Sequence, residues 1–147
     1  KVSFSWRILI RLNNKCMGFL DRFFDSSDTH EDSFWNTISN EQELDDIIKS
    51  SIGKPKVIFK HSNQCGTSFF AKRNLEITDK DSLERVDIYL IDVIRQRALS
   101  RYFGDKVGVR HESPQLFVLK DGTVVWHGSH HQVNENNLKT AINQALG

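Results

Sequence analysis

"PQLFVLKDGTVVWHG", residues 114–128, contains two apolar runs that are separated by Asp121 and Gly122. An Asp-Gly pair between two such runs is a strong signal for a β-hairpin with a two-residue turn. We therefore predict two neighbouring antiparallel strands here. A closing helix should follow at 134–146, because Asn134 is a suitable N-cap for that segment.

Upstream of the hairpin, β-prone and helical segments alternate. Strands are predicted at 34–38, 56–60 and 85–93, and helices at 41–51, 65–78 and 94–104. The helix at 65–78 carries Phe69, Phe70 and Ile77 at helical spacing, and Gly104 is the predicted C-cap of the helix at 94–104. Strands that are joined through helices should be parallel, so the hairpin completes a mixed central sheet with helices on both faces. This α/β arrangement, written βαβαββα, resembles the thioredoxin fold.

The composition is that of a single globular domain without a strong charge bias. The chain has 147 residues, 27% of them charged, and a net charge of +1, which is ordinary for one domain. No long basic stripe is present, so no nucleic-acid partner is expected. No apolar run approaches the roughly 20 residues that a membrane span needs, so no membrane partner is expected. The composition does not predict an oligomeric state.

The domain is predicted to span residues 34–147, after an N-terminal extension at 1–33. Residues 25–33, DSSDTHEDS, are polar and acidic without periodicity, which is typical of flexible chain. Met17 is the only methionine, and MGFLDRFF at 17–24 reads as a natural start. On that interpretation residues 1–16 are not native.

The two cysteines, Cys16 and Cys65, are too few for a disulfide framework and fit a reducing compartment. Cys65 follows the predicted strand at 56–60 and opens the predicted helix at 65–78. The first N–H groups of a helix lack intrahelical partners and its dipole favours negative charge, so a thiolate is stabilised there. The alternative is a small cysteine packed in the core. Polar neighbours on both sides of Cys65 favour the reactive thiol.

A second thiol is missing where a C-x-x-C motif would place it, because that position holds Ser68. Cys16 lies in the extension and is a poor resolving partner. The simplest remaining chemistry is monothiol exchange, in which Cys65 attacks a mixed disulfide and keeps the small thiol. Two alternatives stay open. A thiol peroxidase would also use one activated thiol, with Thr67 near it, and a thioredoxin-fold stress or adaptor protein would need no reactive thiol.

The histidines offer weaker signals. His127, His130 and His131 lie near the end of the last predicted strand. A His-x-x-His pair can bind zinc, but a structural zinc site needs four ligands, so no metal is expected. His61, directly after the strand at 56–60, is either a solvated loop residue or an electrostatic neighbour of Cys65.

Three motifs resemble those of the monothiol bacilliredoxin family. They are FKHS at 59–62, RHESPQ at 110–115 and WHGSH at 126–130, and the resemblance covers residues 35–147. Ser68 matches the family, whereas Gly66 and Thr67 stand where Pro and Ile are usual. The resemblance implies a thiol–disulfide oxidoreductase that removes bacillithiol, or a similar low-molecular-weight thiol, from S-bacillithiolated proteins. It also implies the cytoplasm of low-GC Gram-positive bacteria, bacillithiol as a co-substrate and no cofactor.

The resemblance to thioredoxin-like proteins also implies a substrate platform. In such proteins a cis proline before the fourth strand faces the active cysteine, and Pro114 holds that place. A cis Ser113–Pro114 bond would leave the backbone of Ser113 free to pair with an incoming thiol. Both residues are therefore expected to bind substrate opposite Cys65.

Further substrate contacts are expected around the thiol. His130 is predicted to form a wall of the site. Bacillithiol carries the two carboxylates of malate, so a cationic rim would suit it, and Lys60, Arg110 and His111 are the candidates. The remaining predicted contacts lie at the helix start: Gly66, Thr67 and Ser68.

Overall fold

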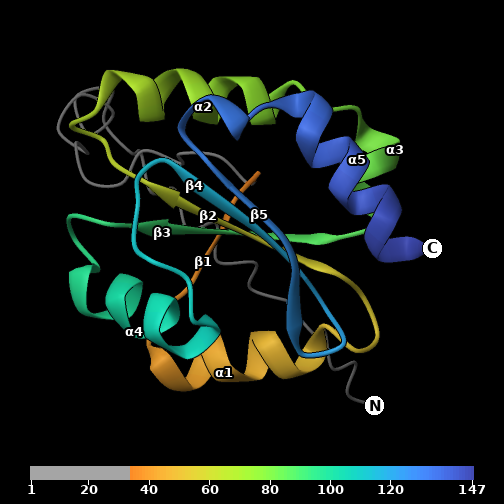
Figure 1. Ribbon diagram of the computed structural model, residues 1–147, viewed down its shortest axis with the longest axis horizontal. Coiled ribbons are helices and arrows are strands. Elements are labelled where there is room, and N and C mark those ends of the chain that lie inside the picture. Colours follow the sequence, from red (N-terminus) through yellow and green to blue (C-terminus); the bar gives the residue numbers. More distant parts are fainter. Residues whose placement is uncertain (1–33) are drawn as a thin grey trace, which may run out of the picture. The chain divides into compact units, whose positions relative to one another are not determined.

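The computed structural model describes residues 34–147 of the chain, which are drawn in colour in Figure 1. The proposed extension at 1–33, with Cys16 and Met17, lies outside the described residues. Its flexibility and the status of residues 1–16 therefore stay predictions.

A mixed five-stranded sheet forms the centre of the described domain, with the strand order β1-β3-β2-β4-β5. β1 and β2 both pair in parallel with β3, whereas β4 pairs antiparallel with β2 and with β5. The mixed α/β sheet predicted from the sequence is confirmed. The strands are β1 (Asn36–Thr37), β2 (Lys56–His61), β3 (Asp87–Asp92), β4 (Gln115–Lys120) and β5 (Thr123–Ser129).

Helices cover both faces of the sheet (Figure 1). On one face lie α1 (Glu41–Ser50) and α4 (Arg97–Val107), and on the other lie α2 (Gly66–Glu76), α3 (Lys80–Glu84) and α5 (Glu135–Leu146). The order βαβαββα describes the chain from β2 to α5; β1 and α1 precede it. The short α3 and the 3-10 turn η2 (His130–Gln132) are additions that the sequence did not predict.

The hairpin turn has the backbone conformation that its Asp-Gly sequence favours. Asp121 and Gly122 have φ values of 52° and 78°, and a two-residue turn with two left-handed residues matches the twist of the strands that it joins. Glycine adopts this conformation without steric cost, and aspartate does so more readily than most residues. The predicted hairpin is confirmed.

Successive side chains of β2 point to opposite faces of the sheet, and the core therefore has two layers. Ile58 packs with Phe103 and Phe117 on the side of α1 and α4. Phe59 packs with Leu75 and other residues on the side of α2 and α5. β2 is the central strand and every residue of it is buried. Side chains on both faces of β2 are therefore shielded from solvent.

The end of α4 differs from the prediction. The helix passes through Gly104 and ends at Gly108, which adopts the left-handed conformation with φ 68°. At Gly104 the helix backbone instead lies close to two other groups. A Cβ atom there would lie 3.1 Å from the carbonyl oxygen of Val109 and 3.5 Å from Nζ of Lys60. Both sites favour glycine, but for different reasons.

The inner face of α2 also differs from the apolar pattern that its sequence suggests. Ser68, Ala71 and Leu75 are its buried residues. Phe69 and Phe70 are exposed to solvent at 52% and 67%. The helical spacing of the aromatic residues therefore marks the outer face of this helix.

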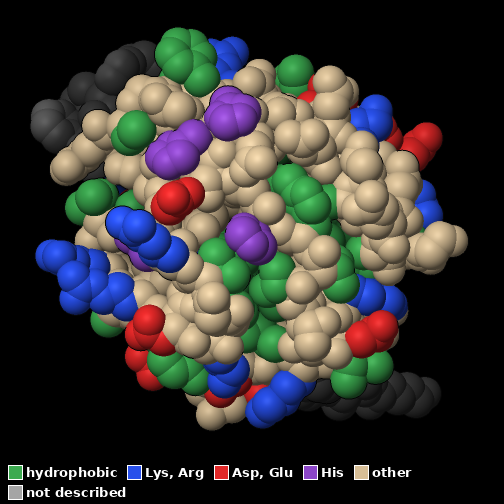
Figure 2. Space-filling view, viewed as in Figure 1, with side chains coloured by type: hydrophobic (Ala, Val, Ile, Leu, Met, Phe, Trp, Pro, Cys, Tyr) green, Lys and Arg blue, Asp and Glu red, His purple; other side chains and the backbone are tan. Residues whose placement is uncertain are grey.

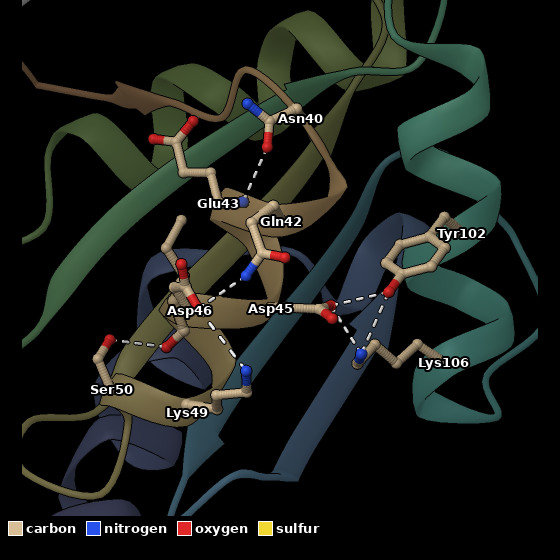
Figure 3. A network of polar contacts seen from close by, with 10 residues as sticks. Asn40, Gln42, Glu43, Asp45, Asp46, Lys49, Ser50, Tyr102 and Lys106 are labelled. Atoms are coloured by element: carbon tan, nitrogen blue, oxygen red, sulfur yellow. Dashed lines mark hydrogen bonds and ion pairs between the residues drawn. The ribbon is translucent and has the colours of Figure 1, made fainter.

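Polar contacts hold α4 against α1 (Figure 3). The hydroxyl of Tyr102 donates to Asp45 at 2.9 Å, and Nζ of Lys106 lies 2.6 Å from the same carboxylate. Asn40 caps α1 by accepting a hydrogen bond from the N–H of Glu43 at 2.9 Å. These contacts fix the position of α4 beside the sheet.

Candidate functional site

Cys65 is the N-cap residue of α2. Its backbone is extended, its side chain is partly exposed, and its carbonyl accepts the first intrahelical hydrogen bond, from the N–H of Phe69 at 3.0 Å. No side chain caps this helix start, and its first turn holds no acidic residue. The free N–H groups of the first turn can therefore stabilise negative charge on the sulfur of Cys65.

A buried hydrogen-bond network shapes the loop that carries Cys65. Oγ of Ser68 lies 2.9 Å from Nδ1 of His61 and accepts a hydrogen bond from the N–H of Ser62 at 3.0 Å. Nε2 of His61 lies 2.7 Å from Oδ1 of Asn63. A neutral imidazole fits these contacts, because Nε2–H can donate to the amide oxygen while Nδ1 accepts from the Ser68 hydroxyl. The residues before and after Cys65 are thus held together.

His61 has a different place from either role that the sequence suggested. It is the last residue of β2 and only 3% exposed, so it is not a solvated loop residue. Burial lowers its pKa, against smaller opposing effects from Asn63 and Asp92. With both ring nitrogens engaged and the neutral form favoured, His61 positions the loop and does not act as a charged neighbour of Cys65.

The loop is also attached to the end of β3. The N–H of Val93 donates to the carbonyl of His61 at 2.9 Å, and the side-chain amide of Asn63 donates to Asp92 at 3.2 Å. The carboxyl ends of the two parallel strands β2 and β3 therefore meet beside Cys65. Such an edge is where open α/β sheets bind ligands.

Cys65 is the only cysteine among residues 34–147, and it is free. Ser68, one helical turn later, is fully buried and its hydroxyl is engaged in the network. Within the described residues, Cys65 therefore has no partner for an internal disulfide.

Gly66, Thr67 and His130 line one groove of about 450 Å³, together with Phe70 and residues of η2. Figure 2 shows histidine side chains gathered on this side of the molecule, near α2 and η2. Nε2 of His130 lies 3.7 Å from the carboxylate of Glu112. The structure thus brings together three of the predicted substrate contacts at the start of α2.

The Ser113–Pro114 bond is cis, as predicted. The carbonyl of Pro114 accepts a hydrogen bond from the N–H of His130 at 3.0 Å. Lys60 and Gln115 are the last residue pair between β2 and β4, so Pro114 directly precedes the paired part of β4 at the end of the sheet where β2 leads to Cys65. The loop before β4 therefore runs along the strand that leads to Cys65.

Lys60 is not part of a cationic rim, which corrects that candidate. Its side chain is fully buried on the face covered by α1 and α4. Its Nζ lies 5.4 Å from the ring centres of both Phe103 and Phe117. Burial lowers the pKa of Lys60 to about 8. The reason is its position in the central strand, where alternate residues face the two layers of the core.

Arg110 and His111 are exposed, but they lie in the loop between α4 and β4 and line hollows other than the His130 groove. His111 borders a cavity of about 330 Å³, here called the α4 cavity. Two arginines of α4, Arg97 and Arg101, border it as well, and the sequence analysis missed them. Their spacing of four residues on a predicted helix was the available signal. The complete lining is Val93, Ile94, Arg97, Ser100, Arg101 and His111.

Residues 34–147 hold no group of three or more His, Cys, Asp or Glu side chains arranged to bind a metal ion. None of the helices in the described part of the chain is long and apolar enough to cross a membrane.

Comparison with known proteins shows similarity to a monothiol bacilliredoxin family model and to solved proteins with a thioredoxin fold. The family model described as "Monothiol bacilliredoxin BrxC" matches residues 36–138. A solved protein described as a candidate oxidoreductase with a thioredoxin fold is 30% identical, with a TM-score of 0.64, and the match covers 71% of this chain and 90% of that one.

Two thioredoxins support the fold alone, because their sequence identity is low. The thioredoxin of Malassezia sympodialis is 21% identical with a TM-score of 0.61, over 77% of this chain and 91% of that one. The thioredoxin of Fasciola hepatica is 21% identical with a TM-score of 0.59, over 75% and 98%.

Proposed function

The chain belongs to the monothiol bacilliredoxin family and is a thiol–disulfide oxidoreductase with a thioredoxin fold, and we propose that it removes bacillithiol, or a similar low-molecular-weight thiol, from mixed disulfides on proteins. The observation that carries the proposal is the environment of Cys65: a partly exposed thiol at an uncapped helix start, with a buried serine one turn later. This arrangement supports nucleophilic attack without a resolving thiol.

The exchange takes two steps. First, the thiolate of Cys65 attacks the small-thiol sulfur of the mixed disulfide; the old S–S bond breaks, a new one forms to Cys65, and the substrate protein leaves as a thiolate. Second, a low-molecular-weight thiol attacks the small-thiol sulfur now bound to Cys65. This step returns Cys65 as a thiolate and releases a small disulfide, so the attacking thiol is the reductant. Water protonates the departing thiolates according to pH.

The chain contributes orientation and charge stabilisation to these steps. The N–H groups at the start of α2 stabilise the thiolate, both before attack and when it leaves. Gly66, Thr67 and His130 form the groove in which the substrate chain lies, and the backbone of Ser113 pairs with the substrate. The proposed substrates are S-bacillithiolated proteins of the cytoplasm.

The peroxidase alternative has less support. A peroxidatic thiol is expected to have an arginine directed at its sulfur, and no arginine is among the described residues that line the groove beside Gly66. Peroxide reduction is therefore tested as a contrast to the proposed exchange.

The test is to incubate the full chain with a bacillithiolated peptide and to follow both peptide thiol release and the mass of the protein. We expect a bacillithiol adduct on Cys65 and stoichiometric release of peptide. Cys65→Ser should abolish both, and Cys16→Ser should leave both unchanged. Absence of the adduct in the unmodified chain would refute the proposal, and oxidation by peroxide that outpaces exchange would favour the peroxidase.

A further inference from the structure

The α4 cavity has a basic lining. It opens between the end of β3 and the first two turns of α4, and Arg97, Ser100 and Arg101 stand on the same side of that helix. The first turn of α4 carries no acidic residue, so the positive end of the helix dipole adds to the arginine charges. Figure 2 shows basic side chains at the corresponding edge of the molecule, beside the start of α4.

A buried ammonium group lies near a hollow that adjoins the α4 cavity. A hollow that shares Arg101 and His111 with the α4 cavity is also lined by Gly104. Nζ of Lys60 lies 3.5 Å from the position that a Cβ atom of Gly104 would take. Lys60 is fully buried, and its Nζ has no hydrogen-bond partner among the described residues. An unpaired buried cation is costly, and an anion nearby would compensate it.

One histidine and two aspartates lie near these positive charges. Partial desolvation of the His111 ring lowers its pKa, and the charges of Lys60 and Arg101 lower it further. Asp105 lines the second hollow and attracts the Lys60 ammonium, but it does not line the α4 cavity. Asp92 precedes the cavity in the chain, and its carboxylate already accepts from the N–H groups of Ile94 and Arg95.

Hydrogen bonds connect the lining of the cavity with the loop that carries the reactive thiol. Val93, which lines it, donates its N–H to His61, and Asn63 bonds to Asp92. Cys65 is two residues beyond Asn63, at most about 7 Å along the chain. A small thiol held at both places would have its sulfur at Cys65 and its other end at the start of α4.

We propose that the α4 cavity binds the carboxylate groups of the small thiol that Cys65 receives, with Arg97 and Arg101 as specificity residues. The inference rests on the proposed exchange at Cys65 and names the part of the substrate that the enzyme selects. Arginine suits carboxylates because its planar guanidinium can donate two parallel hydrogen bonds. A volume of about 330 Å³ accommodates a dicarboxylate fragment rather than a folded segment of a substrate protein.

A binding experiment tests the cavity without any redox chemistry. The full chain with Cys65→Ser is titrated with malate and with its neutral diamide, malamide, and backbone amide shifts are followed by NMR. We expect malate to shift the signals of Val93, Ile94 and the first turns of α4, and malamide to leave them unchanged. Arg101→Gln should weaken malate binding about tenfold, the usual size of one charge-assisted contact. Arg85→Gln, which removes the same charge at the end of α3, should change it by less than about twofold.

An exchange experiment then connects the cavity with Cys65. Rates of adduct formation are compared for bacillithiol disulfide, glutathione disulfide and the neutral 2-hydroxyethyl disulfide. Arg97→Gln and Arg101→Gln should each slow the carboxylate-bearing disulfides about tenfold and leave the neutral one within about twofold. The ratio between the first two disulfides tells which source of carboxylates the cavity prefers.

The outcomes separate the two proposals. If malate does not bind, or if Arg101→Gln slows all three disulfides equally, the cavity is not a carboxylate site, whatever Cys65 does. If Cys65 of the unmodified chain reacts with none of the disulfides, the proposed exchange fails, and the malate titration still decides whether the cavity binds carboxylates.

Discussion

Replacing Lys60 by methionine tests how much stability the protein loses by keeping a cation inside the sheet. The Lys60 side chain is fully buried in the apolar layer between β2 and α4, near two phenylalanine rings, and its Nζ has no hydrogen-bond partner among the described residues. Methionine has a similar length and no charge, so it can fill the same space. We expect Lys60→Met to be more stable than the unmodified protein at pH 7.

The magnitude follows from the pKa. Burial lowers the pKa of Lys60 from 10.5 to about 8, a difference of about 2.5, and at about 1.36 kcal/mol for each pKa unit the charged form loses about 3 kcal/mol. Cation–π contacts with the two rings offset about 1 kcal/mol of that cost. Lys60→Met should therefore raise the free energy of unfolding by about 2–3 kcal/mol at pH 7.

The effect has a defined dependence on pH. Below about 8 the lysine is charged in both the folded and the unfolded state, and the full cost is present. Between about 8 and 10.5 the unfolded state binds more protons than the folded state, so the stability of the unmodified protein rises with pH relative to the variant. The advantage of Lys60→Met should therefore shrink across this window.

Urea unfolding at pH 7 and at pH 10 measures both quantities. Lys56→Met is the matched control, because Lys56 is also buried in β2 but forms an ion pair of 2.5 Å with Asp87. That variant should lose stability at pH 7, since Asp87 loses a partner. If Lys60→Met were equally stable or less stable at pH 7, with no change toward pH 10, the argument from an unpaired buried charge would be refuted.

Two further predictions concern the start of α2. Gly66→Pro should stabilise the protein by about 0.5–1 kcal/mol, because proline suits the first position of a helix. Nothing lies within 4 Å of a Cβ atom at Gly66, and Cys65 already has the extended backbone that a following proline requires; a lower melting temperature would contradict this. Ser68→Ala should cost about 2–4 kcal/mol and slow exchange while Cys65 remains open to alkylation, since a buried N–H and an imidazole nitrogen lose their hydroxyl partner. Thr67→Ala, an exposed change on the same turn, is the control for stability, and equal losses of stability in the two variants would exclude a special role of the buried hydroxyl.

Most of the fold could be predicted because its signals are local. The Asp121-Gly122 turn and the cap at Asn134 each depend on a few neighbouring residues. Alternating segments then restrict the topology to parallel strands followed by a hairpin. The family motifs placed Cys65 and Pro114 in the same way, since each sits at the boundary of an element.

The errors arose where a residue's surroundings depend on distant elements. Lys60 borders an apolar run and reads as a strand end, but β3 and β4 flank β2 and helices cover both of its faces. Gly104 reads as a helix end, although it is the point where α4 approaches Lys60 and Val109. Arg97 and Arg101 carried no motif at all. Their joint position at the α4 cavity exists only once α4 lies beside the end of β3.

The buried serine at position 68 connects the shape of the site with its chemistry. Its hydroxyl accepts from the N–H of Ser62 and engages His61, and those two contacts hold the loop that presents Cys65. A thiol at that position would be a larger group and a weaker hydrogen-bond partner, so the same contacts would lose strength. The residue that orders the loop is therefore also the one that leaves Cys65 without a resolving partner within the described chain. In the proposed exchange, such a nucleophile returns its small thiol to an external reductant, and we propose that the arginines of α4 recognise that thiol.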